Sequence, residues 1–192
     1  MERRSFLKNA GLAGIIASGS APAVVMAQES IRWRLASSFP KSLDTIYHAA
    51  EVFSKQVSEM TEGKFQISIH VGGELLPPLG VLDGVSNGTV ECGHTIPNYY
   101  IGKDPAFALD GTIPFGMNTR QMTAWMYEGN GLKLTREFYR QHNIVNFPMG
   151  NTNAQMGGWY RKEVKTVEDL KGLKMRISGL AGRVVEKLGV VP

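Results

Sequence analysis

The stretch IRWRLASSFPKSLDTIYHAAEVFSKQVSEMTEGKFQISIHV, residues 31–71, holds two strand patterns separated by one helix pattern. In residues 31–36 and 65–71, apolar side chains alternate with polar ones, which is typical of half-buried strands. Between them, over residues 43–60, apolar positions recur every three or four residues, as they do on an amphipathic helix. A strand, a helix and a second strand at this spacing predict a βαβ unit with parallel strands.

The βαβ pattern continues along the chain with a short helix at residues 79–87 and a third strand at residues 90–95. We therefore predict an α/β fold, a parallel-rich sheet flanked by helices. In such sheets ligands bind beyond the carboxyl ends of the strands. The segments that follow the three strands, residues 37–40, 72–74 and 96–100, are thus expected to line one edge of a ligand site.

The second part of the chain carries weaker patterns. Residues 119–141 predict a long helix that is interrupted near 129–131, where two glycines flank an asparagine. Period-2 alternation predicts three further strands, and a helical pattern closes the sequence. These strands are expected at residues 144–148, 156–161 and 173–178, and the final helix at residues 182–188.

Residues 1–27 predict an export signal and no folded structure. Arg3 and Arg4 open a basic segment, a mildly apolar stretch follows at residues 9–25, and small residues favour cleavage near Ala27. The paired arginines favour the twin-arginine type of signal, and an ordinary secretory signal is the alternative. We expect the protein in the periplasm, with no membrane-spanning segment in the mature chain.

Composition limits the function classes. The formal charge of +4 includes +2 from residues 1–27, where three basic residues oppose one acidic residue, so the mature chain carries about +2. Its Lys and Arg residues are scattered among carboxylates without a basic run, which argues against nucleic-acid binding. Cys92 is the single cysteine, so an intrachain disulfide is excluded.

The sequence does not contain the motifs of common enzymes. The four histidines show no metal-ligand spacing, and no nucleophile elbow or phosphate-binding loop is present. The remaining polar groups lie in residues 150–155 and around Arg176, which precedes the glycine-rich stretch 178–183. Amide side chains and an arginine suit the binding of a carboxylate. Alternation alone leaves Arg176 open between an anion ligand and a solvated strand charge.

The stretches GNTNAQMGGWYRKEVKTVEDLKGLKMRISGLAG, LASSFPKSLDTIYHAAEVFSKQVSEMTEGKF and YYIGKDPAFA resemble the extracytoplasmic solute-binding proteins of TRAP transporters. The resemblance is to the 2-oxo acid and monocarboxylate branch, and it extends over about residues 30–192. It implies a two-lobed fold of the periplasmic binding protein kind, type II-like, that closes on a small carboxylate and delivers it to a membrane permease. It implies no enzymatic activity and no covalent cofactor.

The resemblance also implies roles for individual residues. Arg176 matches the arginine that pairs with the substrate carboxylate in this family. Gln155 matches a glutamine that contacts both the substrate and a bound cation, usually sodium and in some members calcium. An aromatic residue from the loop after the third strand lines the pocket, which makes Tyr99 or Tyr100 the candidate, with Tyr100 preferred. Phe39 replaces a tryptophan that is frequent at its position.

Family members are longer than this chain. We expect residues 28–148 to form lobe I and residues 149–192 to begin a lobe II that is truncated here. An arginine without an opposing wall makes a shallow site, so we expect the chain alone to bind 2-oxo acids weakly or not at all. A homodimer is a further expectation. A periplasmic cofactor-containing enzyme domain and a sensory ligand-binding domain stay open as alternatives.

Overall fold

A computed structural model describes residues 30–192 of the protein, except residues 112, 154 and 178. The predicted export signal and its cleavage site lie outside the described residues. The strands of the described chain are β1 (Ile31–Ser37), β2 (Phe65–His70) and β3 (Cys92–His94). Its α-helices are α2 (Asp44–Met60), α3 (Val81–Ser86), α4 (Thr119–Tyr127), α5 (Gly131–Arg140) and α6 (Gly179–Glu186). The 3₁₀ turns are η1 (Pro78–Gly80), η2 (Pro97–Tyr100), η3 (Pro105–Ala108) and η4 (Glu168–Leu170).

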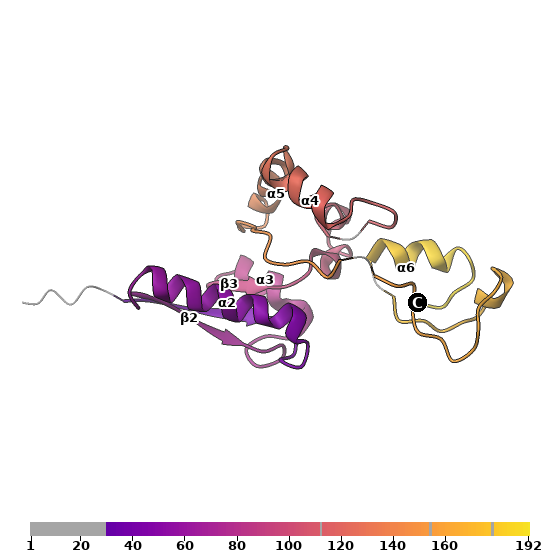
Figure 1. The fold of residues 1–192 in the computed structure, drawn as a ribbon, viewed down its shortest axis with the longest axis horizontal. Helices are drawn as coiled ribbons and strands as arrows, with labels where there is room; N and C mark the ends of the chain where they lie inside the picture. Colours follow the sequence, from indigo (N-terminus) through magenta and orange to yellow (C-terminus); the bar gives the residue numbers. More distant parts are fainter. Residues whose placement is uncertain (1–29, 112, 154, 178) are drawn as a thin grey trace, which may run out of the picture.

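The strands form one parallel sheet in the order β2-β1-β3. Strand β1 pairs with β2 from Ile31 opposite Phe65 onward, and its carboxyl half pairs with β3. Helix α2 lies along the sheet (Figure 1) and buries Ala50 against Leu35 and Ile67. The predicted βαβ unit and α/β class are therefore confirmed.

A second core cluster holds the loops that follow β3. The side chains of Tyr100 and Phe107, from η2 and η3, pack with Leu82 of α3 and Tyr139 of α5. The ring centroids of Tyr100 and Phe107 are 5.8 Å apart in an edge-on arrangement, a favourable geometry for aromatic pairs. This cluster fixes η2 at the carboxyl edge of the sheet.

The helical region after residue 118 breaks where the sequence predicts. Helix α4 ends at Tyr127 and α5 starts at Gly131. The start of α4 has a capping box, because Asn118 accepts a hydrogen bond from the Gln121 amide and the Gln121 side chain accepts one from the Asn118 amide. The prediction of one interrupted helix is confirmed.

The expected strands of the second part do not form among the described residues. Residues 144–148 and 156–161 have no strand partner, and residues 173–178 make one isolated bridge, Lys174 to Val191. A strand is stable only when its backbone groups find partners on a neighbouring strand. Alternation of side chains was present, but the described residues supply a pairing partner only at the bridge.

Two other boundaries differ from expectation. Strand β3 covers Cys92–His94, where the sequence predicted 90–95, because only these residues pair with β1. The last helix is Gly179–Glu186, about one turn earlier than the predicted 182–188. Its first residue is a glycine with φ of +70°, which the periodicity of apolar residues does not reveal.

In Figure 1, the sheet and α2 lie together at one end of the molecule, and α6 with its loops lies at the opposite end. Helices α4 and α5 lie above them in this view. Helix α6 meets the rest of the chain at η2. The division into lobes at residues 148 and 149 stays a prediction. In the described part of the chain, the helices are too short or too polar to cross a lipid bilayer.

Candidate functional site

The loops at the carboxyl edge of the sheet are hydrogen-bonded to one another. The amide of Ser38, which follows β1, donates to the carbonyl of His94 in β3 at 2.8 Å. The amide of Gly72, which follows β2, donates to the carbonyl of Phe39 at 3.0 Å. The segments 37–40 and 72–74, two of the three expected at a ligand site, are thus hydrogen-bonded to each other. Ser38 also connects them to the end of β3.

A line of hydroxyl groups connects this edge to η2. The Ser38 hydroxyl lies 2.6 Å from Thr95 Oγ1, and Thr95 Oγ1 lies 2.8 Å from the Tyr100 hydroxyl. The Tyr100 oxygen also accepts a hydrogen bond from the Leu82 amide at 3.2 Å. Ser38 and Thr95 were not singled out from the sequence, although both stand directly after predicted or observed strands.

The predicted pocket residue Tyr100 lies in the core of the described chain. Its side chain is 2% exposed, and its hydroxyl is engaged by Thr95 and Leu82. Its neighbour Tyr99 is half-buried, and the two ring centroids are 6.5 Å apart. Tyr100 therefore anchors η2 from within, and Tyr99 is the more accessible aromatic residue of this loop.

Phe39, in the loop after β1, packs against His94 at the end of β3. Their ring centroids are 5.0 Å apart, and both side chains are buried. Burial lowers the pKa of His94 to about 4, so its imidazole is neutral at physiological pH. Its Nδ1 atom has no hydrogen-bond partner among the described residues. His94 was interpreted from sequence only as a histidine without metal spacing.

Arg176 is exposed, and within the described chain its guanidinium forms no ion pair. The preceding residue, Met175, is held in place because its amide donates to the Val191 carbonyl at 3.0 Å and its sulfur lies 3.7 Å from the Tyr160 hydroxyl. The backbone beside Arg176 is therefore tethered, while its guanidinium donors have no hydrogen-bond partner among the described residues.

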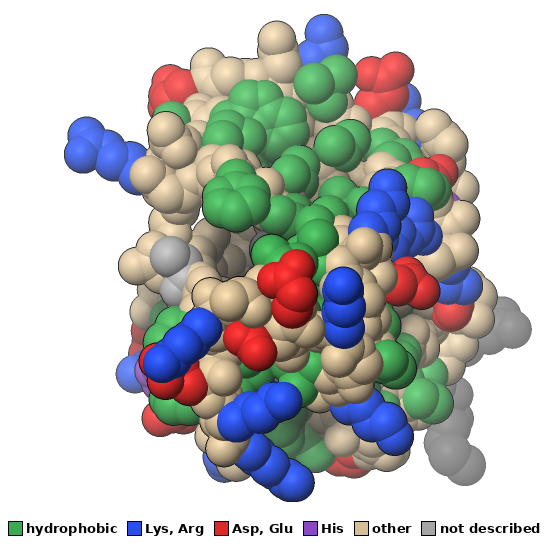
Figure 2. Space-filling view, turned by 90° about the vertical axis from the view of Figure 1, so that its right-hand side faces the viewer, with side chains coloured by type: hydrophobic (Ala, Val, Ile, Leu, Met, Phe, Trp, Pro, Cys, Tyr) green, Lys and Arg blue, Asp and Glu red, His purple; other side chains and the backbone are tan. Residues whose placement is uncertain are grey.

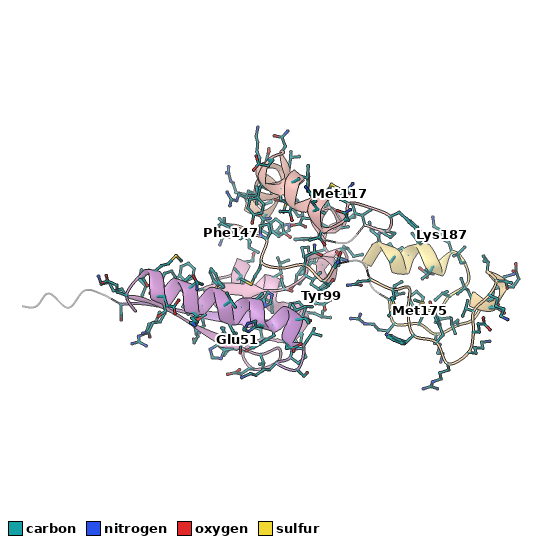
Figure 3. The ribbon with its side chains drawn as sticks, viewed as in Figure 1. Glu51, Tyr99, Met117, Phe147, Met175 and Lys187 are labelled. Carbon is teal, nitrogen blue, oxygen red and sulfur yellow. The ribbon has the colours of Figure 1, made fainter. Side chains whose placement is uncertain are left out.

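The segment that contains Arg176 approaches η2 through the start of α6. A Cβ atom at Gly179 would lie 3.3 Å from Nδ2 of Asn98 in η2. Figure 3 shows Tyr99 at the junction between the sheet region and α6, with Met175 on the far side of that junction. The structure thus brings the Arg176 segment to the loop that Tyr100 anchors.

Gln155 is exposed in a polar turn that docks on α4. Its Nε2 donates to the Thr152 hydroxyl at 3.0 Å. The turn is tethered because the hydroxyl of Thr119, the first residue of α4, donates to Asn151 Oδ1 at 2.9 Å. No hydrogen bond joins Gln155 to Arg176 in the part of the chain that the structure describes.

Whether the described residues could bind sodium or calcium depends on the oxygen ligands that they offer. Sodium and calcium prefer several oxygen ligands, commonly with carboxylates for calcium. Gln155 fits as one neutral ligand, because its amide nitrogen is used by Thr152 and its amide oxygen is left for a cation. Over the described residues, however, no three His, Cys, Asp or Glu side chains gather as a metal site. The role of Gln155 as a cation ligand therefore stays a prediction, and the described residues show no cluster of charged ligands that would hold a cation.

In α/β folds, ligands bind at the carboxyl ends of parallel strands, and the segment that carries the exposed Arg176 reaches the loops there through the start of α6. In the comparison with known families, bacterial extracellular solute-binding protein, family 7, matches residues 36–192, and the chain belongs to this family.

Individual relatives agree with this assignment. The chain is 55% identical over 161 residues to the monocarboxylate 2-oxoacid-binding periplasmic protein of Nostoc sp. strain PCC 7120, which covers 84% of this chain and 44% of the relative. It is 53% identical, with a TM-score of 0.83, to a TRAP transporter solute-binding protein from Bordetella bronchiseptica, covering 85% of this chain and 48% of the other. That structure is a mixed-occupancy dimer in which one site holds copurified calcium and picolinate.

A third relative is a TRAP periplasmic solute-binding protein from Pseudoalteromonas atlantica with bound sodium and pyruvate. It is 44% identical, with a TM-score of 0.81, covering 85% of this chain and 50% of the other. The chain thus spans about half the length of the relatives that it matches. The resemblance to TRAP solute-binding proteins and the fold class are confirmed, and these relatives are described as binding proteins and not as enzymes.

Proposed function

We propose that this chain supplies the substrate-facing loops of an extracytoplasmic receptor for a small monocarboxylate of the 2-oxo acid type, which serves a TRAP membrane permease. The observation that carries the proposal is the position of Arg176. It is exposed and unpaired among the described residues, and the helix that follows it packs against η2 at the carboxyl edge of the sheet. That edge is where α/β sheets bind ligands.

Arg176 is the proposed partner of the substrate carboxylate. A guanidinium presents two parallel N–H groups, which match the two oxygens of a carboxylate. An ion pair of this kind in open water stabilises a complex by only about 0–1 kcal/mol. The chain alone is therefore expected to bind 2-oxo acids weakly or not at all, because the arginine faces solvent in the described structure.

Gln155 is the proposed contact to both substrate and cation. The ligands named in the related structures, pyruvate and picolinate, share a chemical feature. Each places a second lone-pair donor, a carbonyl oxygen or a ring nitrogen, next to its carboxylate and can chelate one cation with both. A site that selects 2-oxo acids through a bridging sodium or calcium ion would use an amide oxygen such as that of Gln155 as a further ligand.

Tyr100 is proposed to act on the pocket through η2. Its buried hydroxyl holds the loop on Leu82 and Thr95, and this places Tyr99 and Asn98 toward the start of α6. The buried Phe39 and His94 rings would give the wall below them an apolar, uncharged character. Such a wall suits the short carbon chain of a 2-oxo acid.

Export and assembly complete the proposal. Residues 1–27, with their paired arginines, are proposed to direct the chain to the periplasm through the twin-arginine route, with cleavage near Ala27. The loaded receptor would then hand its ligand to the permease. A homodimer is proposed as well, with support from the dimeric relative of Bordetella bronchiseptica.

The function can be tested with a fused polypeptide that joins this chain to the carboxyl-side remainder of the Nostoc relative. We expect isothermal titration calorimetry to show pyruvate binding at least about tenfold tighter than acetate binding, a difference of about 1.4 kcal/mol, because acetate has no second donor. Replacement of sodium and calcium by choline should weaken pyruvate and leave acetate nearly unchanged. Equal affinities for the two acids in every buffer would refute the 2-oxo acid assignment.

A further inference from the structure

Strand β2 and the turn after it bring together a serine, a histidine and a carboxylate that the receptor function does not use. Ser68 and His70 are two residues apart on β2, so their side chains lie on the same face of the sheet. Ser68 Oγ lies 3.3 Å from His70 Nε2, and His70 Nδ1 lies 2.7 Å from Glu74 Oε1. These three residues are here called the β2 cluster. A hydroxyl, an imidazole and a carboxylate in this order are the groups that activate a serine nucleophile.

The turn after β2 fixes the carboxylate of Glu74. Its amide donates to the Val71 carbonyl at 3.1 Å, and its Oε2 atom accepts from the Val71 amide at 3.2 Å. The hydrogen bond from His70 is the main cause that lowers the pKa of Glu74, so the carboxylate is charged at neutral pH. A charged carboxylate only accepts, so Nδ1 of His70 carries the hydrogen, and Nε2 of the neutral imidazole is an acceptor beside Ser68.

The Ser68 hydroxyl has two acceptors within reach. The carbonyl oxygen of Trp33 on β1 lies 3.3 Å from Ser68 Oγ, the same distance as His70 Nε2. Rotation of the hydroxyl hydrogen alone moves the hydrogen bond from one acceptor to the other. Ser68 is exposed, so a reagent in solution reaches its oxygen directly. Ser68 can therefore give its proton to His70 without a movement of the strand.

The backbone beside Ser68 offers a donor for a developing negative charge. The amide of Ile31 in β1 donates to the Lys64 carbonyl, and in this parallel register the amides of the even-numbered residues of β2 face β1. The Ile69 amide therefore faces the outer edge of the sheet and has no hydrogen-bond partner among the described residues. An amide directly after the nucleophile is a common donor to the oxyanion of acyl transfer.

We propose that the β2 cluster is a nucleophilic site that hydrolyses activated esters of short carboxylic acids, in addition to the receptor function and independently of it. Ser68 Oγ attacks the ester carbonyl carbon while its proton passes to His70 Nε2. The bond to the leaving alcohol breaks, the alcohol takes that proton, and the acyl group remains on Ser68. Water then attacks the acyl carbon, the acid is released, and a proton returns through His70 to Ser68 Oγ. Glu74 is a positioning residue, because it holds the imidazole as an acceptor and does not touch the ester.

The β2 cluster lies apart from the Arg176 segment. Strand β2 belongs to the sheet end of the molecule and α6 to the opposite end (Figure 1). Figure 2 faces the α6 end, and histidine side chains take up little of the surface there. The cluster is open to solvent, so water weakens the stabilisation of charge and the rate gain is small compared with that of an enclosed site. An assay therefore needs a reactive ester and no carboxylate ligand.

The test follows hydrolysis of p-nitrophenyl acetate by the purified mature chain, measured as release of p-nitrophenolate. Free imidazoles also react with this ester, so His48→Gln is the matched control. His48 is exposed and its Nδ1 atom lies 3.1 Å from Glu51 Oε2, but no serine contacts its ring among the described residues. We expect Ser68→Ala and His70→Gln each to lower the rate above buffer at least about tenfold, and His48→Gln to change it less than about twofold.

Mass spectrometry of the parent chain, quenched during turnover, locates the acyl group without any variant. We expect an acetyl group on Ser68. Glu74→Gln should lower kcat about tenfold and leave KM unchanged, because the substitution disturbs the tautomer of His70 and not the ester. No hydrolysis above the rate in buffer, an unchanged rate in Ser68→Ala, or an acetyl group on another residue would overturn the proposal. Equal losses in His48→Gln and His70→Gln would overturn it too.

Discussion

Gly179, the first residue of α6, lies against Asn98 of η2 so closely that a Cβ atom on the glycine would come within 3.3 Å of the asparagine Nδ2. Its φ of +70° lies in the left-handed region that favours glycine. This contact joins the segment of Arg176 to the carboxyl edge of the sheet. The position of the Arg176 segment relative to η2 therefore depends on the close contact of Gly179 with Asn98.

The first prediction concerns that contact. Gly179→Ala should lower the free energy of unfolding by roughly 1–2 kcal/mol, because alanine is strained at this φ and its methyl group would press on Asn98. Gly172→Ala is the matched control, since Gly172 has a φ of +72° but nothing within 4 Å of its Cβ position. Urea unfolding of both variants separates the cost of backbone strain, which the two variants share, from the cost of the contact with Asn98, which only Gly179→Ala has. A loss for Gly179→Ala that is equal to or smaller than that for Gly172→Ala would show that the contact does not matter.

The second prediction concerns the anchor of η2. Tyr100→Phe removes the acceptor of the buried Leu82 amide and the partner of Thr95, which should cost about 1–3 kcal/mol of stability. Tyr99→Phe, one residue earlier and half-buried, should cost less than about 0.5 kcal/mol. Chemical unfolding monitored by fluorescence measures both. Similar losses of stability in the two variants would show that the Tyr100 hydroxyl does not anchor η2.

The third prediction concerns acid stability. Burial lowers the pKa of His94 to about 4 from an ordinary value of 6.5, so the unfolded chain binds a proton more readily than the folded chain. The stability that His94 contributes is complete above pH 6.5 and is lost as pH falls toward 4. The loss should reach up to about 3 kcal/mol. His94→Gln should flatten this part of the stability profile, and an unchanged slope would contradict the burial argument.

The fourth prediction concerns stability that is lost as pH rises, whereas the His94 effect is lost as pH falls. Burial raises the pKa of Asp110 to about 6. The Tyr139 hydroxyl, which donates to the Asp110 carboxylate at 3.4 Å, lowers this pKa by a smaller amount. The folded chain therefore holds the Asp110 proton longer than the unfolded chain, and stability from this group is lost as pH rises from about 4 through 6. Asp110→Asn should be more stable than the parent at pH 7, by up to about 3 kcal/mol. The advantage should disappear below pH 4, and its persistence there would point to another cause.

The sequence predicted those parts of the fold in which local pattern and pairing agree. Residues 31–71 alternate as strands on both sides of an amphipathic helix, and the two strands pair with each other, so the βαβ unit formed as expected. The same alternation at 144–148 and 156–161 gave no strand, because these residues find no strand partner within the described chain. Alternation indicates which side chains would lie on the same face of a strand, but the strand forms only where a neighbouring strand is available to pair with it.

The candidate site was predictable only in outline. The residue type and position of Arg176 indicated a carboxylate ligand, and the structure leaves it exposed and unpaired among the described residues. Sequence gave no sign that Tyr100 would be buried, because the burial depends on the meeting of η2, η3 and α5 in one aromatic cluster. Ser38 lies in the segment 37–40 that was expected at the edge, but its hydroxyl contact with Thr95 was not foreseen, since it joins residues 57 positions apart.

The central claim is that Arg176 is the residue that binds the substrate carboxylate. Its most direct test is calorimetric titration of pyruvate into the fused polypeptide described above, with Arg176→Gln compared with Lys174→Gln. Both side chains are exposed and lie on the same parity of one segment. We predict that Arg176→Gln weakens pyruvate binding by about 100-fold or more while Lys174→Gln changes it less than about threefold, because only Arg176 forms a charge-assisted pair with the ligand. Equal, small effects of the two substitutions would contradict the account.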